Sequence, residues 1–328
     1  MDLYRVKQHA QKALAQTGGK AKQLTALYAG VSLGVPLLIT VASFVLSRQL
    51  DSMTGLSALG SRAILETIQF LLQLAGTAAL PFWHIGYLRA ALQCSRGEDT
   101  SPATLLEGFG RFWAVLRYFL LQLLLVMALM FVSMQIAIVL FAFTPFTGDM
   151  IDKLEPVLTQ VQQANLTDIP LGEILPYILP MYILIGVVAL VLGIPVFYRL
   201  RLSGFAIMDG STGALQALAV SAKRMRGRSI QLFRLDLQFW WFYLACGVSV
   251  AVSYGDVLLS HLGINLPGNP DAWFFVFYGI YLVTQFLLTW QYSAGIQTAY
   301  AAFYDVAATV QTQPQPQPGK QPWDDTIR

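Results

Sequence analysis

Charged residues are scarce in this chain. Asp, Glu, Lys and Arg together make up 12% of its 328 residues, which is about half of the ~25% found in ordinary soluble domains. Apolar residues make up 55% of the sequence, and the mean hydropathy is +0.55. This composition excludes a disordered chain, a nucleic-acid-binding domain and an ordinary soluble enzyme. It is typical of a protein that crosses a membrane several times.

Cysteine and the familiar ligand-binding motifs are also nearly absent. The two cysteines, Cys94 and Cys246, lie far apart and belong to no CxxC or zinc-type spacing, so we expect neither a disulfide nor a metal site. The sequence contains no phosphate-binding loop, EF-hand or dinucleotide-binding fingerprint. We therefore expect no cofactor and no nucleic-acid partner, and the sequence favours a protein that is not an enzyme.

Six apolar stretches are long enough to cross a bilayer as helices. A membrane-spanning helix needs about 20 apolar residues, and the predicted spans cover residues 24–46, 63–88, 112–141, 177–198, 230–253 and 272–303. The sequence thus predicts an all-α bundle of six transmembrane helices over residues 24–304. Residues 1–23 form a basic segment without the apolar core of a signal peptide. Residues 305–328 form a Gln- and Pro-rich tail that we expect to be disordered.

The positions of Lys and Arg predict the orientation of the bundle. If the N-terminus is cytoplasmic, all but three of the 21 Lys and Arg residues fall in or beside cytoplasmic segments. The exceptions are Arg48, Arg62 and Lys153. Because Lys and Arg concentrate in cytoplasmic loops, we expect both termini to be cytoplasmic.

The two long cytoplasmic loops are predicted to contain short helices on the membrane surface. Ser101 precedes Pro102, an arrangement typical of a helix start, and an apolar face follows it; residues 213–225 form a similar pattern. The two loops also match each other in spacing within one residue. The matched positions are Pro81 with Pro195, Arg96-Gly97 with Asp209-Gly210, Leu105 with Leu218 and Arg111 with Arg224. Such an internal repeat occurs in transporters, and a duplicated structural scaffold produces the same pattern.

Four polar residues in or near the spans are candidates for an intramembrane site, because such groups are costly in a bilayer and often functional. They are Glu66, His84, Asp236 and Gln285. For the first three, which lie near span ends, local ion pairing or snorkelling is the alternative interpretation. For Gln285, the alternative is an interhelical hydrogen bond.

A basic cluster follows the second predicted surface helix and consists of Lys223, Arg224, Arg226 and Arg228. Each basic residue close to an anionic leaflet contributes about 1 kcal/mol of attraction. We expect this cluster to contact anionic lipid of the inner leaflet or a partner protein. A homo-oligomer is also left open by the sequence.

Small residues recur at the spacing that lets membrane helices approach closely. The predicted packing positions are Gly30, Gly34, Gly247, Ala251, Gly295 and Ala299. Residues 30–34 also match G-x-S-x-G around Ser32, and His84 is expected at a similar depth, so an intramembrane serine hydrolase is a remote alternative. That motif normally requires a strand before the serine, and helix packing is therefore the favoured interpretation.

Four segments in the second half of the chain carry a resemblance to a known family. They are SAKRMRG at 221–227, LFRLDL at 232–237, FWW at 239–241 and TAYAAFY at 298–304. They resemble a bacterial family of multi-pass integral membrane proteins of unknown function, distantly similar to the membrane domain attached to some glycerophosphodiester phosphodiesterases. The resemblance covers about residues 215–304, and Pro267 departs from the family's pattern. It implies a helical fold in the bacterial inner membrane and no catalytic residues.

Two functions remain open from the sequence. A non-enzymatic scaffold or accessory protein of the bacterial cell envelope fits the lack of catalytic motifs and the abundance of packing motifs. A transporter of a small or lipid-like substrate fits the internal repeat and the prolines within the spans.

Overall fold

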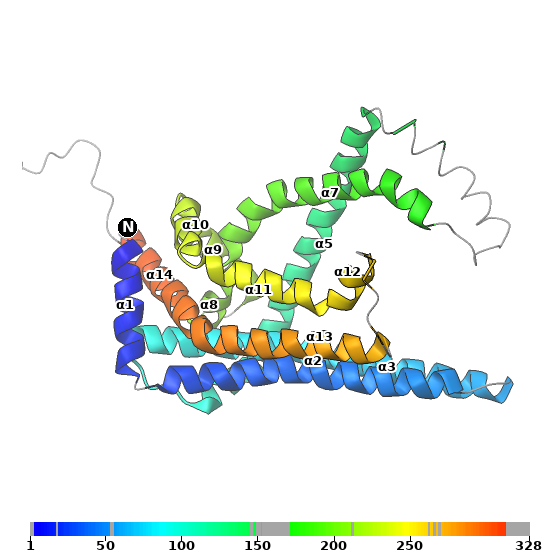
Figure 1. Ribbon diagram of the computed structural model, residues 1–328. Coiled ribbons are helices and arrows are strands. Elements are labelled where there is room, and N and C mark those ends of the chain that lie inside the picture. The colour runs from blue at the N-terminus through cyan, green and yellow to red at the C-terminus, as the bar shows by residue number, and fades with distance from the viewer. Residues whose placement is uncertain are drawn as a thin grey trace, which may run out of the picture. The chain divides into compact units, whose positions relative to one another are not determined.

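The computed structural model describes residues 3–17, 19–52, 56–144, 147–148, 152, 171–210, 213–261, 263–264, 267 and 270–312. Every regular element within these residues is a helix (Figure 1). The all-α prediction is therefore confirmed for the described part of the chain. Most residues between the third and fourth predicted spans lie outside it, as does the tail from residue 313.

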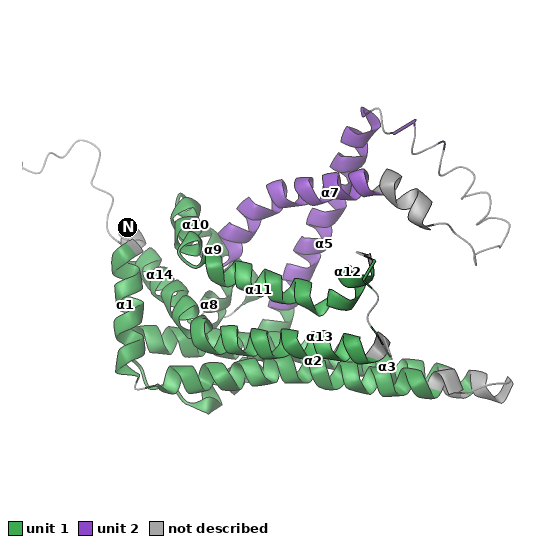
Figure 2. Cartoon of the chain, in the orientation of Figure 1, with its two compact units in different colours: residues 1–117, 202–328 green, residues 118–201 purple. Residues whose placement is uncertain are grey.

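The chain divides into two compact units (Figure 2). Unit 1 consists of Met1–Arg117 and Leu202–Arg328, and unit 2 consists of Tyr118–Arg201. Unit 2 contains most of helix α5 (Phe112–Ala142) and helix α7 (Leu171–Leu200). The helices of unit 1 are α1 (Leu3–Gln16), α2 (Lys20–Ser52), α3 (Leu56–Arg96), the 3₁₀ turn η1 (Pro102–Leu106), α4 (Glu107–Gly110), α8 (Ser203–Met208), α9 (Ala214–Met225), α10 (Ser229–Leu237), α11 (Trp240–Ser253), α12 (Gly255–His261), α13 (Pro270–Leu288) and α14 (Ala294–Thr312).

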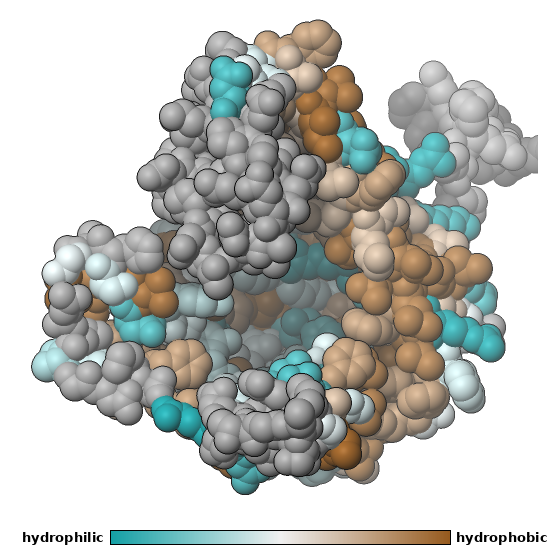
Figure 3. Space-filling model, turned by 90° about the vertical axis from the view of Figure 1, so that its right-hand side faces the viewer, coloured by the Kyte–Doolittle hydropathy of each residue, from teal (hydrophilic) through white to brown (hydrophobic). Residues whose placement is uncertain are grey.

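Five helices are long and apolar enough to cross a membrane. They cover Lys20–Gln49, Ala63–Arg96, Phe112–Ala142, Leu179–Met208 and Ala272–Thr309. Large apolar side chains remain exposed along them, for example Leu38 at 70% and Phe131 at 61%, and the surface view shows broad apolar patches (Figure 3). Because water-soluble proteins rarely expose so much apolar surface, these helices suggest a protein embedded in a membrane.

The predicted fifth span, residues 230–253, is not one continuous helix. It consists of α10 and α11, which are bent by 67° at the break between them. Helix α10 buries Leu232 and Leu235 but also carries Arg234 and Asp236. This mixed composition leaves α10 amphipathic, so only the pair together is apolar enough for a span. The prediction of six spans therefore holds only if this bent pair counts as one span.

The last helix also differs from its predicted boundary. Helix α14 continues to Thr312, although the disordered tail was expected from residue 305. Packing explains the extension, because Tyr304 and Ala307 are almost completely buried. A π-helical turn at Thr289–Ser293 joins α13 to α14.

The first predicted surface helix exists as η1 and α4, which pack against α3 and which we call the bracket. Leu105 of η1 is completely buried in a cluster with Leu24, Tyr87 and Ala90. Leu106 and Phe109, by contrast, are 55% and 41% exposed. The second predicted surface helix exists as α9, which buries a row of mostly small residues, Ala214, Ala217, Ser221 and Met225.

Two glycines allow the backbone of this bracket to contact α3. A Cβ atom added to Gly86 of α3 would lie 2.0 Å from the carbonyl oxygen of Leu105. A Cβ atom added to Gly108 of α4 would lie 2.0 Å from the carbonyl oxygen of Phe82. Both contacts are with backbone, which cannot move aside as a flexible side chain can. Glycine is therefore required at this crossing.

We expect Gly108→Ala to lower the free energy of unfolding by about 2 kcal/mol, because the added methyl group forces the bracket away from α3. Thermal unfolding in detergent measures the change. The matched control is Gly30→Ala, since no atom of the described residues lies within 4 Å of a Cβ atom there. Equal melting temperatures for the two variants would contradict the close crossing.

Candidate functional site

The candidate site is a charged network in unit 1. It lies where α3 ends, close to α8, α9 and α14, and we call this region the loop end. Helix α3 stops at Arg96 because Gly97 takes a φ of +71°. The N–H of Glu98 then donates to the Gln93 carbonyl at 2.9 Å, and that of Gly97 to the Cys94 carbonyl at 3.1 Å. This is a glycine-terminated helix end. Helix α8 also ends close to a glycine, because Asp209 follows it and Gly210 then has a φ of +106°.

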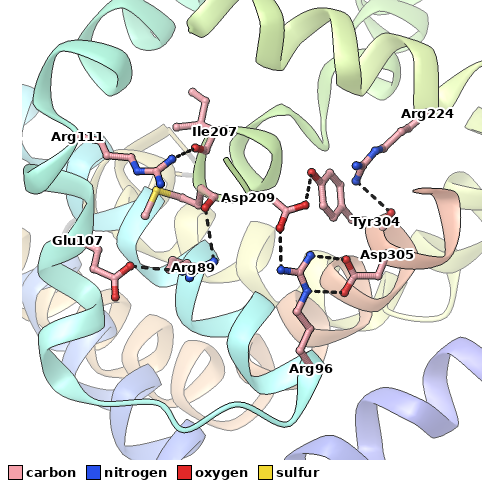
Figure 4. A network of polar contacts seen from close by, with 10 residues as sticks. Arg89, Arg96, Glu107, Arg111, Ile207, Asp209, Arg224, Tyr304 and Asp305 are labelled. Atoms are coloured by element: carbon pink, nitrogen blue, oxygen red, sulfur yellow. Dashed lines mark hydrogen bonds and ion pairs between the residues drawn. The ribbon is translucent and has the colours of Figure 1, made fainter. Parts of the chain in front are cut away.

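Arg96 joins two carboxylates from distant parts of the sequence. Its Nη1 lies 2.7 Å from Oδ1 of Asp209. Its Nη2 and Nε donate to Oδ1 and Oδ2 of Asp305 on α14, at 2.7 Å and 3.1 Å (Figure 4). The three side chains are only 22–31% exposed. A bidentate contact between a guanidinium group and a carboxylate, both partly buried, is stronger than an ordinary surface ion pair.

Tyr304 extends this network to α9. Its hydroxyl group donates to Oδ2 of Asp209 at 3.0 Å, and the residue is 1% exposed. The guanidinium group of Arg224 lies 3.8 Å from the centre of the Tyr304 ring, a distance typical of a cation–π contact. Two arginines, two aspartates and one tyrosine thus connect the ends of α3 and α8 with α9 and α14 (Figure 4).

Arginines also bond backbone carbonyl groups in this region. Arg111 donates to the carbonyl oxygen of Ile207 at 2.6 Å, and Arg228 donates to that of Ala307 at 2.7 Å. Arg89 lies 3.4 Å from Glu107 and within 3.5 Å of the Met208 carbonyl oxygen. Cations near the C-terminal carbonyls of α8 interact favourably with that helix end. The arginines therefore hold the short helices in place.

The basic cluster predicted to meet lipid divides into two pairs. Arg224 and Arg228 turn towards α14, where they make the contacts described above. Lys223 and Arg226 are exposed. Contact of the cluster with lipid or a partner stays a prediction, and Lys223 and Arg226 are its two most exposed members.

For three of the four predicted intramembrane polar residues, the structure shows three different hydrogen-bond partners. Nδ1 of His84 lies 2.9 Å from the hydroxyl group of Tyr28. Asp236 accepts a hydrogen bond from Tyr300 at 2.5 Å. The other two lie elsewhere: the amide of Gln285 donates to the carbonyl oxygen of Cys246 at 3.1 Å, and Glu66 is exposed on α3.

The Ser32 motif has no catalytic pairing with His84. The hydrogen-bond partner of His84 is Tyr28, and no hydrogen bond between Ser32 and His84 occurs in the part of the chain that the structure describes. Tyr28 also stacks on Tyr87, with ring centres 4.1 Å apart. This geometry is that of a packed aromatic cluster.

The predicted small-residue contacts are mostly open within the chain. A Cβ atom added to Gly30, Gly34 or Gly247 would meet no described atom of another helix within 4 Å. Ala251 is exposed. Close packing of other helices at these positions is therefore absent among the described residues, because α2 and α11 direct these small residues away from their neighbours.

The remaining two packing positions, Gly295 and Ala299, lie on α14. A Cβ atom on Gly295 would make an ordinary contact with Leu14 at 3.9 Å, and Ala299 is 1% exposed. The glycines at the tightest backbone approaches, Gly86 and Gly108, were not among the predicted positions, although Ala90 follows Gly86 at the small-xxx-small spacing.

Sequence reasoning also missed the network around Arg96. One signal could have found part of it: Arg96 and Asp209 occupy matched positions in the internal repeat, each before a glycine, and carry opposite charges. Asp305 gave no such signal because it falls in the predicted tail.

The described residues contain no group of three or more His, Cys, Asp and Glu side chains that could hold a metal ion. Cys94 is buried and Cys246 is half-buried, and both are free thiols. No family model matches the chain, and neither a curated protein nor a solved structure matches it.

We expect Arg96→Gln to lower the free energy of unfolding by about 2 kcal/mol, because it leaves two half-buried carboxylates without a cation. Thermal unfolding in detergent provides the measurement. Lys20→Gln is the matched control, since Lys20 pairs with Asp99 at 3.1 Å but both side chains are well exposed, at 59% and 96%. A loss as large in the control would contradict a special role for the network.

Proposed function

We propose that this chain is a non-enzymatic scaffold or accessory protein of a bacterial cell envelope. It would lie in the inner membrane with both termini in the cytoplasm. The long apolar helices support membrane embedding, and the distribution of Lys and Arg supports the orientation. The family resemblance of residues 215–304 supports the bacterial source.

The network around Arg96 is the observation that carries the scaffold proposal. It joins the segments that contain Arg96, Asp209 and Asp305 into one firm end of unit 1. The charged groups there contact one another and backbone carbonyls, which is the arrangement expected of a structural support. Catalysis would instead need reactive groups that face a substrate cavity.

Helix α9 offers the surface with which this support could hold a partner. Its inner row of residues packs inside unit 1, whereas Leu215 is 70% exposed. Lys223 is exposed on the same helix, and Arg226 is exposed directly after its end. An exposed apolar side chain at one end of a helix and cations at the other suit an anionic lipid surface or an acidic protein segment.

A transporter of a small or lipid-like substrate is the second candidate. The π-helical turn at Thr289–Ser293 favours it, because such turns are frequent at functional sites. The hydroxyl group of Tyr87 donates to Ser293 in this turn at 3.3 Å. That contact places a polar group inside the bundle, where a transported substrate could bind.

Native mass spectrometry of the protein extracted in lipid-preserving particles tests the scaffold proposal. We expect a protein partner at fixed stoichiometry, and we expect Arg226→Glu to release it. Lys22→Glu is the matched control, because it makes the same charge change at an exposed position on α2. A chain that emerges alone with one retained small molecule would contradict the scaffold and favour transport.

Single-cysteine labelling in intact cells tests the orientation, with both native cysteines replaced by alanine. Asp152→Cys should react with a membrane-impermeant reagent, because residue 152 is predicted to lie outside the cell. Arg226→Cys should react only after the cells are opened. Both positions are exposed, so burial does not explain a difference, and the reverse pattern would overturn the predicted orientation.

A further inference from the structure

A groove with a volume of about 500 Å³ lies in unit 1 between the start of α5 and the segment before α9. Arg111, Trp113 and Arg117 line one side of it. Gly210 and Gly213 line the other and place no side chains in it. This volume is within the range of small-molecule sites, roughly 300–1,000 Å³. None of its lining residues belongs to the network around Arg96.

Two arginines make the groove cationic. Arg117 is exposed and has no hydrogen-bond or ion-pair partner among the residues that the structure describes. Arg111 uses one nitrogen to bond the Ile207 carbonyl, and a guanidinium group has five N–H donors in all. Several donors on each side chain therefore remain available to an anion.

No acidic residue is among the described residues that line the groove, and the nearest ones along the sequence are engaged elsewhere. Glu107 pairs with Arg89 at 3.4 Å, and Asp209 pairs with Arg96 at 2.7 Å. The positive charge of the groove therefore has no counter-charge from its own lining, and an anionic ligand is the complementary occupant.

Trp113 indicates that the anion belongs to a membrane lipid. It lies four residues before Arg117 on α5, so both side chains are on one face of the helix. Trp113 is 68% exposed and Phe112 is 43% exposed. Tryptophan at the end of a membrane helix prefers the boundary between lipid headgroups and acyl chains, and arginine matches the geometry of phosphate oxygens.

We propose that this groove binds the headgroup of one anionic glycerophospholipid. Arg117 and Arg111 bind its phosphodiester oxygens, and Trp113 contacts the glycerol backbone and the first acyl carbons. The proposal rests on the membrane embedding proposed above but not on the scaffold role. It differs from the attraction of lipid by Lys223 and Arg226, which involves no groove.

A lipid titration of the full chain in detergent, followed by native mass spectrometry, tests the site. The probes are phosphatidylglycerol and phosphatidylcholine with identical acyl chains, and soluble glycerol phosphate. We expect one phosphatidylglycerol to bind roughly tenfold more tightly than phosphatidylcholine, and Arg117→Gln to weaken it by about tenfold, as loss of a charged hydrogen bond predicts. Trp113→Leu keeps both charges and should weaken binding of both lipids.

Lys22→Gln, at an exposed position on α2, is the matched control and should bind phosphatidylglycerol like the unmodified chain. An equal loss in this control would mean diffuse attraction and would overturn the proposal, as would equal affinity for the two lipids or unchanged binding by Arg117→Gln. Tight binding of glycerol phosphate would instead show a site for a soluble anion. A partner protein retained by Arg117→Gln but lost by Arg226→Glu would separate this site from the scaffold function.

Discussion

The bridge from Arg96 to Asp209 and Asp305 is the interaction on which the loop end of unit 1 depends. It joins the end of α3 to α14 and to the residue after α8. Ion pairs on an open surface contribute little to stability, but this guanidinium group is 29% exposed and contacts both carboxylates at 2.7 Å. The short connecting helices of unit 1 thereby gain a fixed arrangement.

The fixed loop end determines what the other charged residues can do. Arg224 of α9 and Arg228, directly before α10, contact α14, whereas Lys223 and Arg226 are exposed. Arg111 bonds the Ile207 carbonyl and thereby keeps one side of the basic groove near the segment that follows α8. Structural support and the proposed lipid binding therefore use different donors of the same kind of side chain.

The sequence alone predicts the helical class and the approximate positions of the long apolar helices, because length and hydropathy determine both. It also predicts α9, because residues 213–225 show the apolar face of a surface helix. It fails at the bend before α11, because the hydropathy averaged over residues 230–253 combines the amphipathic helix α10 with the apolar helix α11. It also fails at Gly86 and Gly108, because a close backbone crossing depends on residues that meet only after folding.

The central claim is that Arg96 holds the connecting helices to α14, and amide hydrogen exchange of Arg96→Gln in detergent tests it most directly. We predict faster exchange in α8, in α9 and in the last turns of α14, with little change in α2 and α13, whose packing does not involve Arg96. Unchanged protection in α8 and α9, or an equal loss of protection in every helix of unit 1, would contradict the claim.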